Sequence, residues 1–233
     1  SPQIDLASDP RWVRFEGTMG EDPNLVTDLA RSYVDGFQST NTKGWGVNSV
    51  NTMIKHWPGG GTGEGGRDGH YGFGSYAVYP GDNIEEHMKI FTEGALNLRG
   101  NTLSASAIMP YYTIALGNGE EVGSAYNNYL INNILRDKYQ YDGVLCTDWG
   151  ITGDAFAVDV FFSGKSFGVE NLTVAERHYK ALMSGMDQFG GNNDMIPVLE
   201  AFKIGVEEYG EDFMRNRFEK SAVRLLKNIF NVG

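Results

Sequence analysis

The stretch GVLCTDW at residues 143–149 decides the fold class, because an apolar run ends there in a carboxylate and an aromatic ring. The run from Gly143 to Thr147 is predicted to be a short buried strand, with Asp148 and Trp149 at its carboxyl end. A charge placed directly after a buried strand loses hydration, so it requires a partner or a function. In a parallel α/β fold the carboxyl ends of the strands line the ligand site. Asp148 and Trp149 are therefore candidate site residues.

Predicted strands and helices alternate on both sides of this stretch. The predicted strands span residues 4–7, 47–57, 103–111, 143–147 and 185–189, and the predicted helices span residues 22–38, 85–98, 122–139, 173–183, 194–208 and 211–230. Strands that alternate with helices indicate a parallel sheet. A complete (β/α)8 barrel needs eight such units and typically about 250 residues. The pattern therefore predicts an α/β fold, either an open sheet or a (β/α)8 TIM-type barrel that is incomplete at its N-terminus.

Two of the predicted helices begin with specific capping signals. Asp22 has the side chain of a typical N-cap, and Pro23 follows at the first helical position, where its missing N–H costs nothing. Thr173 is followed three residues later by Glu176, which is the spacing of a capping box. These signals fix the expected starts of both helices.

The composition restricts the classes of partner. The chain has 233 residues, and 19 basic against 30 acidic residues give a formal net charge of −11. We therefore expect neither nucleic acid nor a membrane as a partner, since a nucleic acid or an anionic membrane requires a basic surface. Cys146 is the single cysteine, which excludes an intrachain disulfide and a cysteine-based zinc site. The sequence has no run of about 18 apolar residues, and it leaves the cellular compartment open.

Polar and aromatic residues also end the two preceding strands. Lys55 and His56 lie near the end of the strand predicted at 47–57, and Tyr111 and Tyr112 end the strand predicted at 103–111. The glycine-rich loop over residues 58–83 is too long for an ordinary βα connection of roughly 2–6 residues, which favours a functional loop. Aromatic rings pack on sugars, Lys, His and Asp bind sugar hydroxyls, and a carboxylate can attack an anomeric carbon. These residue types favour a carbohydrate site, with a helix N-cap or a buried salt bridge as an equal alternative for Asp148.

Four segments carry a resemblance to a known family. KHWPGGGT at residues 55–62 is similar to a KHFxGxGGT motif, and YDGVLCTDW at residues 141–149 is similar to FxGVVxSDW. DPRWVR at residues 9–14, followed by Glu16 and by GEDP at residues 20–23, is similar to DPRWGRxxExxGEDP. MPYY at residues 109–112 lies where the same family has a Met-x-x-Tyr stretch. In this order and spacing, over nearly the whole chain, the segments resemble glycoside hydrolase family 3.

The resemblance implies a retaining, exo-acting β-glycosidase of the β-glucosidase type. Such an enzyme releases a terminal β-linked glucose or a similar sugar from a glycoside or small oligosaccharide through a covalent glycosyl-enzyme intermediate. Asp148 matches the catalytic nucleophile of the family. The residues that match its substrate-binding positions are Arg14, Lys55, His56, Tyr112 and Trp149. The resemblance implies no metal and no cofactor.

Two parts of the family's proteins have no matching segment in this sequence. The family barrel has a portion before the DPRWGR segment, with a further glycone-binding aspartate, and most members have a second α/β sandwich domain that commonly supplies the acid/base. We therefore expect residues 1–233 to form a single partial catalytic barrel domain, with the second α/β sandwich domain absent from this chain. The expected partners are these remaining segments, in the same or a companion chain. A partial barrel exposes sheet edges, so we expect it to need them for solubility.

The long loop contains an alternative acid/base, the pair Asp68 and His70. One branch of the family, the β-N-acetylglucosaminidases, uses an Asp-x-His dyad in this loop, although here the dyad lies two residues further from the Lys-His motif. A histidine suits acid/base catalysis because its unperturbed pKa is about 6.5. The alternatives to a β-glucosidase are therefore a β-N-acetylglucosaminidase that uses Asp68 and His70, or a non-catalytic carbohydrate-binding fragment. The structural alternative for His70 is a loop residue bonded to Asp68 or a wall of the aglycone side.

Three further polar segments are assigned structural positions. The adjacent residues Glu85, Glu86 and His87 would point in different directions on a helix, which argues against a shared metal site, so a solvated helix face is predicted for them instead. His178, on another polar helix, is predicted to be at the surface. Asp187 follows Gly185-Met186 and is expected either at the edge of the pocket or as a cap.

Overall fold

The computed structural model describes residues 1–40, 44–155, 159, 161 and 163–233. Its α-helices and strands are, in chain order, α1 (Pro23–Gln38), β1 (Met53–Trp57), β2 (Tyr76–Ala77), α2 (Ile84–Lys89), β3 (Ala107–Pro110), β4 (Ile114–Ala115), β5 (Val144–Leu145), α3 (Val174–Ser184), α4 (Ile196–Tyr209) and α5 (Glu211–Val232). Two segments are π-helical. Ile90–Ala95 extends α2, and Tyr129–Lys138 lies in the connection from β4 to β5. Single 3-10 turns lie at Phe15–Gly17, Gly60–Thr62, Glu64–Gly66, Gly72–Gly74 and Ser124–Tyr126.

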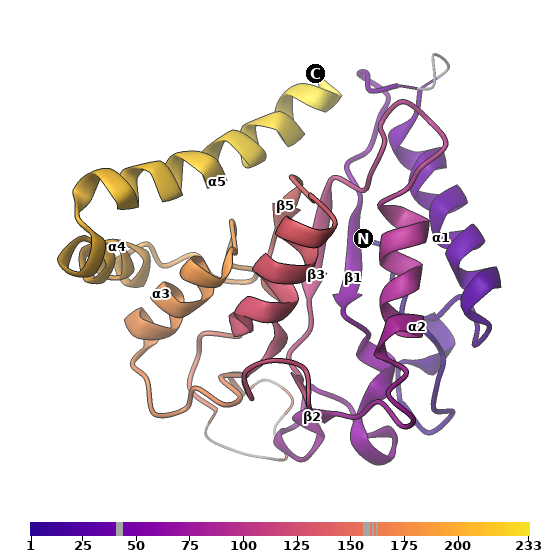
Figure 1. The fold of residues 1–233 in the computed structure, drawn as a ribbon, viewed down its shortest axis with the longest axis horizontal. Helices are drawn as coiled ribbons and strands as arrows, with labels where there is room; N and C mark the ends of the chain where they lie inside the picture. Colours follow the sequence, from indigo (N-terminus) through magenta and orange to yellow (C-terminus); the bar gives the residue numbers. More distant parts are fainter. Residues whose placement is uncertain (41–43, 156–158, 160, 162) are drawn as a thin grey trace.

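The main sheet is parallel, with the strand order β1-β3-β5. Met53 pairs with Ala107, and Ala107 pairs in turn with Val144. Parallel bridges from Gln3 to Lys55 and from Cys146 to Gln188 add one backbone position at each edge. Helices α1 and α2 lie beside β1, whereas α3, α4 and α5 lie beyond β5 (Figure 1). The fold is therefore mixed α/β with parallel strands, as the alternation in the sequence predicts.

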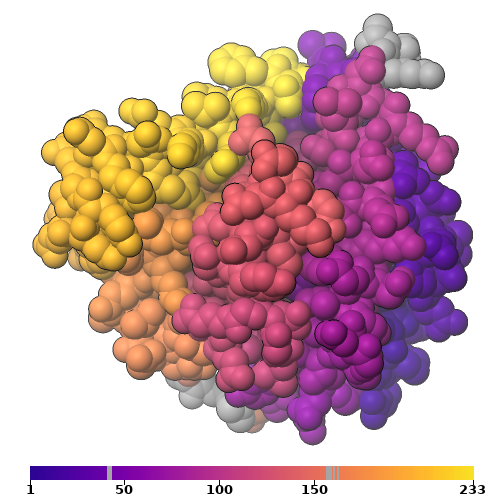
Figure 2. Space-filling model, in the orientation of Figure 1, coloured from indigo at the N-terminus to yellow at the C-terminus, as the bar shows by residue number. Residues whose placement is uncertain are grey.

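Successive segments also follow one another across the face of the molecule shown in Figure 2, from the indigo N-terminal part to the yellow C-terminal part. This order is expected where each helix crosses back over the sheet to the next neighbouring strand. A small second sheet pairs β2 with β4 in parallel and connects the long loop to the segment after β3. No helix within the described residues is long and apolar enough to cross a membrane.

The predicted strands at both edges of the sheet are wrong in extent. The described residues 4–7 contribute no bridge, because the bridge at that edge is made by Gln3, and residues 185–189 contribute a single bridge through Gln188. At the first edge the side chain of Asp5, rather than its main chain, accepts the N–H of His56 at 2.9 Å, so the ladder stops there. The strand predicted from residue 47 begins only at Met53, because Val50 donates its N–H to the end of α1, at Phe37 O.

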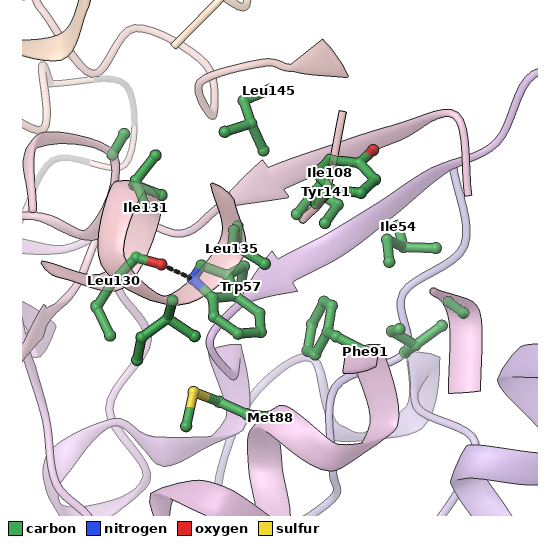
Figure 3. Close-up of a cluster of buried hydrophobic side chains, with 14 of the residues drawn as sticks. Ile54, Trp57, Met88, Phe91, Ile108, Leu130, Ile131, Leu135, Tyr141 and Leu145 are labelled. Carbon is green, nitrogen blue, oxygen red and sulfur yellow. Dashed lines mark hydrogen bonds between the residues drawn. The ribbon is translucent and has the colours of Figure 1, made fainter. Parts of the chain in front are cut away.

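The core lies between the sheet and the helices that cover it (Figure 3). Trp57 is fully buried, donates from Nε1 to Leu130 O at 3.2 Å, and meets Phe91 edge-on with 5.4 Å between ring centroids. Ile54 and Ile108 on neighbouring strands are fully buried in the same cluster. Burying one such side chain contributes roughly 1.5–3 kcal/mol, so this cluster holds β1 and its polar carboxyl end in place.

Both capping predictions are confirmed. The side chain of Asp22 accepts the N–H of Leu25 at 2.8 Å, with Pro23 in the first turn of α1. Thr173 and Glu176 form a reciprocal capping box at the start of α3, in which Glu176 Oε2 accepts the N–H of Thr173 at 2.7 Å. The side chains therefore satisfy N–H groups that the helices themselves leave without acceptors.

Replacing Thr173 with Ala should destabilise the protein by about 1 kcal/mol, because the N–H of Glu176 then loses its acceptor. The change is measured as the free energy of unfolding in urea. Thr173→Ser keeps the hydroxyl and is the control, expected near the wild-type value. Equal losses in the Ala and Ser variants would contradict the capping role.

The predictions for His87 and His178 are wrong, since both side chains are buried. His87 is 3% exposed and packs edge-on against Tyr79, and burial lowers its pKa to about 4, while Glu85 and Glu86 do lie at the surface. His178 is fully buried within α3. Neighbouring positions of a helix point about 100° apart, so a charged neighbour does not place a histidine outside.

Asp187 lies neither at the edge of a pocket nor at a helix cap. Its fully buried side chain contacts three arginines, with Oδ2 at 2.7 Å from Arg136 and Oδ1 at 3.1 Å from Arg224 and 3.7 Å from Arg217. Asp187 Oδ2 also accepts the N–H of Leu145 in β5 at 3.0 Å. This carboxylate therefore ties β5 to α5, in keeping with the rule that buried charges are paired.

Candidate active site

A cavity of about 620 Å³ lies at the carboxyl ends of β1, β3 and β5. The structure brings together all of the predicted site residues along its wall. They are Arg14, Lys55, His56, Asp68, His70, Tyr112, Asp148 and Trp149. The cavity wall also includes Ser1, Val13, Met53, Met109 and Phe161.

His56 lies at the end of β1 and is held from two directions. Its Nδ1 is 2.7 Å from Asp5 Oδ2, and its Nε2 is 3.1 Å from the Arg14 guanidinium. A guanidinium can only donate, so the assigned tautomer carries its proton on Nδ1 and accepts at Nε2. The imidazole is therefore fixed in orientation before any ligand binds.

Asp5 is a site-supporting residue that the sequence prediction missed. Its carboxylate is fully buried and accepts three bonds, from His56 N at 2.9 Å, from Gly60 N at 2.6 Å and from His56 Nδ1. Burial alone raises the pKa of Asp5, but the charge and hydrogen bonds of His56 and the bond from Gly60 outweigh it, so the pKa lies below its usual value. The sequence feature that could have identified Asp5 is its position as the one charged residue in the apolar run from Ile4 to Ala7.

Asp148 follows β5 and keeps one oxygen without a hydrogen bond. Its Oδ1 accepts the N–H of Trp149 at 2.7 Å, whereas its buried Oδ2 has no hydrogen-bond partner among the described residues. Oδ2 lies 3.7 Å from His56 Nε2. A buried carboxylate oxygen without a donor is costly, which is typical of a group that meets a ligand.

Lys55 and Asp148 do not form a direct ion pair, and among the described residues His56 is the basic side chain within 4 Å of the Asp148 carboxylate. Burial and the neighbouring Arg14 lower the pKa of Lys55, and the charges of Asp148 and Asp5 act in the opposite direction. A partly desolvated ammonium beside a carboxylate favours a ligand that offers both acceptors and donors. Vicinal hydroxyl groups have both.

Tyr112 and Trp149 also line the cavity and are bonded to each other. The hydroxyl of Tyr112 donates to Trp149 O at 3.0 Å. Burial, followed by the charge of Asp148, raises the pKa of Tyr112, so the hydroxyl stays protonated. The Trp149 residue is 55% exposed and offers a broad apolar surface next to Asp148.

Asp68 and His70 form a closed pair at the cavity wall. His70 Nδ1 lies 2.5 Å from Asp68 Oδ1, and Asp68 Oδ2 accepts from Trp12 Nε1 at 2.7 Å and from the Tyr111 hydroxyl at 3.2 Å. Burial raises the pKa of Asp68, but the hydrogen bonds from His70 and Trp12 and the charge of His70 lower it to about 2. The imidazole stacks on Phe161, with ring centroids 4.5 Å apart. Asp68 therefore stays ionised and fixes the orientation of His70.

Among the described residues, no cluster of three or more His, Cys, Asp and Glu side chains has the arrangement of a metal site. The cavity instead combines carboxylates, cations, imidazoles and aromatic rings, which suits a neutral polar ligand with apolar faces.

Comparison with known families decides the identity of the domain. Residues 1–227 match the model of the glycosyl hydrolase family 3 N terminal domain. The chain belongs to glycoside hydrolase family 3. Its full length is 36% identical to the probable beta-glucosidase C of Aspergillus oryzae, of which it covers 34%. Over an alignment of 249 residues it is 38% identical to the periplasmic beta-glucosidase/beta-xylosidase of Dickeya chrysanthemi, covering 100% of this chain and 36% of that protein.

Solved structures support the same family 3 fold. A β-glucosidase structure from Erythrobacter marinus superposes with a TM-score of 0.70 and 26% identity, covering 100% of this chain and 27% of that one. A family 3 β-N-acetylglucosaminidase from Paenibacillus superposes with a TM-score of 0.71 at 20% identity, covering 100% of this chain and 39% of that one, and shows the likeness of the fold alone. The chain spans about a third of the length of the curated relatives described above.

Proposed function

We propose that this family 3 domain carries the sugar site of a retaining, exo-acting β-glycosidase of the β-glucosidase type, with Asp148 as its nucleophile. The observation that carries the proposal is the buried Oδ2 of Asp148, which lacks a hydrogen-bond donor and lies 3.7 Å from His56 Nε2. This oxygen attacks the anomeric carbon while the leaving-group oxygen departs with a proton from the acid/base. Water, deprotonated by the same acid/base, then displaces Asp148 and releases the sugar.

The remaining residues have roles in binding the glycone. Arg14, Lys55 and His56 line the cavity, where they bind the hydroxyls of a terminal sugar. Hydrogen bonds of this kind can strengthen as positive charge develops on the ring in the transition state. Tyr112 and Trp149, which line the same cavity, give it an apolar surface for the sugar ring and for the group attached to it.

We also propose that residues 1–233 form a single partial catalytic domain of a (β/α)8 barrel, completed by other segments of the enzyme outside this chain. Three parallel strands flanked by two bridges support this, since they present five successive barrel positions with open edges. The outer face of α1 also carries a stripe of exposed apolar side chains. These are Leu25, Leu29, Tyr33 and Phe37. Further barrel segments would cover such a face, and the second α/β sandwich domain would lie outside residues 1–233.

A second candidate function is favoured by the Asp68 and His70 pair. His70 lines the same cavity as Asp148, and its Nδ1 is held at 2.5 Å by Asp68. In that arrangement His70 would protonate the leaving group and later activate water, as in a β-N-acetylglucosaminidase. In the first proposal this proton comes from another segment, and His70 forms only a wall. A protein that binds sugars without turnover would instead be a non-catalytic module.

Comparing two nitrophenyl glycosides separates these functions. For a β-glucosidase, we expect the β-glucoside to be hydrolysed with a kcat/KM at least about tenfold above that of its N-acetylglucosamine analogue, a difference of about 1.4 kcal/mol. A nitrophenyl and a dinitrophenyl β-glucoside test the role of His70, because departure of nitrophenol depends more on a proton from an acid than departure of dinitrophenol does. If the acid/base lies elsewhere, His70→Asn should lower the hydrolysis rates of these two glucosides by the same factor. Selective loss with the poorer leaving group would instead assign His70 as the acid.

A further inference from the structure

The indole of Trp149 rests on the backbone of two glycines from a distant segment. A Cβ added to Gly191 would lie 2.4 Å from Trp149 Cδ1, and one added to Gly190 would lie 2.9 Å from Trp149 Cε3. The two glycines therefore contact the five-membered and six-membered halves of the ring, respectively. Gly191 also has a φ of +66°, which side chains rarely adopt. No other residue type fits this contact without moving the indole.

The glycine pair is bonded to residues on both sides of Trp149. Gly190 donates its N–H to Thr147 Oγ1 at 2.9 Å, and Gly150 donates its N–H to Gly190 O at 3.3 Å. The segment that precedes and follows Trp149 is thus fixed to the same backbone on which the indole rests. Together these contacts set both the height and the direction of the ring.

A buried histidine is bonded to Asn192, the residue that follows the two glycines. Asn192 accepts the N–H of Asp194 at Oδ1, at 3.0 Å, which leaves its amide nitrogen to donate to His178 Nε2 at 2.7 Å. His178 in turn donates from Nδ1 to Val174 O within α3, also at 2.7 Å. The assigned chain of donors and acceptors has one consistent direction, which requires His178 to be neutral. Burial of His178 lowers its pKa and favours that form.

We propose that Gly190 and Gly191 are positioning residues for Trp149, and that Asn192 and His178 anchor this glycine platform to α3. Because Trp149 borders the cavity next to Asp148, the platform sets how the indole meets the group attached to the terminal sugar. This inference rests on the proposed function for its substrate. The positioning itself depends only on the contacts between the residues named here.

Gly191→Ala tests the platform, with Gly81→Ala as the matched control. Gly81 has a similar φ of +70°, but a Cβ there meets nothing within 4 Å, so it reproduces the backbone strain without the contact to Trp149. In the complete protein, we expect Gly191→Ala to raise KM for an aryl β-glucoside and a β-linked disaccharide roughly 10- to 100-fold, with a smaller change in kcat. Gly81→Ala should leave both parameters unchanged.

A second measurement separates failure of this inference from failure of the proposed function. Acrylamide quenching of tryptophan fluorescence, with Trp149→Phe as the baseline, reports the exposure of Trp149 without any substrate. Gly191→Ala should increase the quenching of Trp149 and Gly81→Ala should not, and Asn192→Ala should shift it in the same direction as Gly191→Ala. If the wild type hydrolyses glucosides but Gly191→Ala matches Gly81→Ala in KM and quenching, the inference is wrong. If the wild type neither binds nor hydrolyses glucosides, the proposed function is wrong and the quenching alone decides the positioning.

Discussion

Asp148→Asn should lower the turnover of an aryl β-glucoside by at least about 10⁴-fold, a loss comparable to removal of one member of a catalytic unit. The amide keeps the size of the side chain and can still accept the N–H of Trp149 at Oδ1. It cannot attack the anomeric carbon, because an amide oxygen is a poor nucleophile. KM should change much less than kcat, since Asp148 acts mainly in the chemical step.

Covalent trapping identifies the nucleophile independently of the rate. A 2-deoxy-2-fluoro β-glucoside with a good leaving group should form a stable ester, and peptide mapping should place the label on the peptide that contains Asp148. Asp137→Asn, an exposed change on the helical segment before β5, is the control and should label as the wild type does. Label on another carboxylate, with Asp148→Asn still active, would contradict the assignment.

Asp5→Ala should destabilise the protein by about 3–5 kcal/mol and reduce binding of the sugar as well. The substitution removes the acceptor from three donors at once, two of them main-chain N–H groups of His56 and Gly60. Among the described residues, the imidazole of His56 then keeps its hydrogen bond to Arg14 and its ring contact with Tyr111 but loses the bond that orients Nδ1. The free energy of unfolding in urea and KM for the aryl glucoside measure the two effects.

The loss of stability in Asp5→Ala should depend on pH in one direction. Because the folded protein holds the pKa of Asp5 below its usual value, ionised Asp5 stabilises the fold above the unfolded pKa of about 3.9, and this contribution is lost as the pH falls through the folded pKa. The difference in stability between wild type and Asp5→Ala should therefore be full at pH 7 and shrink in acid. Asp5→Asn keeps one acceptor oxygen, so its free energy of unfolding at pH 7 should lie between those of the wild type and Asp5→Ala. A difference that does not change with pH would show that the charge of Asp5 contributes nothing.

The sequence predicts the cavity residues well because they lie next to recognisable signals. Lys55, His56, Asp148 and Trp149 all end or follow apolar strands, and the parallel sheet brings such ends together. Asp5 and His178 were missed or misplaced because their partners are distant in the chain. Asp5 contacts His56 across 51 residues, and His178 contacts Asn192 in the segment between α3 and α4.

Strand lengths were also overestimated, for a physical reason. An apolar run specifies burial but not the partner of its N–H groups. At Ile4 to Ala7 the carboxylate of Asp5 takes the bonds that a longer ladder would have used. Helix starts were more predictable, because capping bonds such as those of Asp22 and Thr173 lie within a few residues.

The cluster around Asp187 has a consequence for the order in which the nascent chain matures. Arg136 leaves the ribosome before Asp187, but Arg224 follows it by 37 residues, which corresponds to roughly 2–7 s of synthesis at about 5–20 residues per second. Until Arg217 and Arg224 of α5 have been synthesised, Arg136 is the one of the three arginines that is available to Asp187. Asp187 also accepts the N–H of Leu145, so during this time β5 is bonded to an incompletely neutralised carboxylate. Synthesis of α5 therefore completes the neutralisation of Asp187, and with it the support of β5, the strand that Asp148 follows.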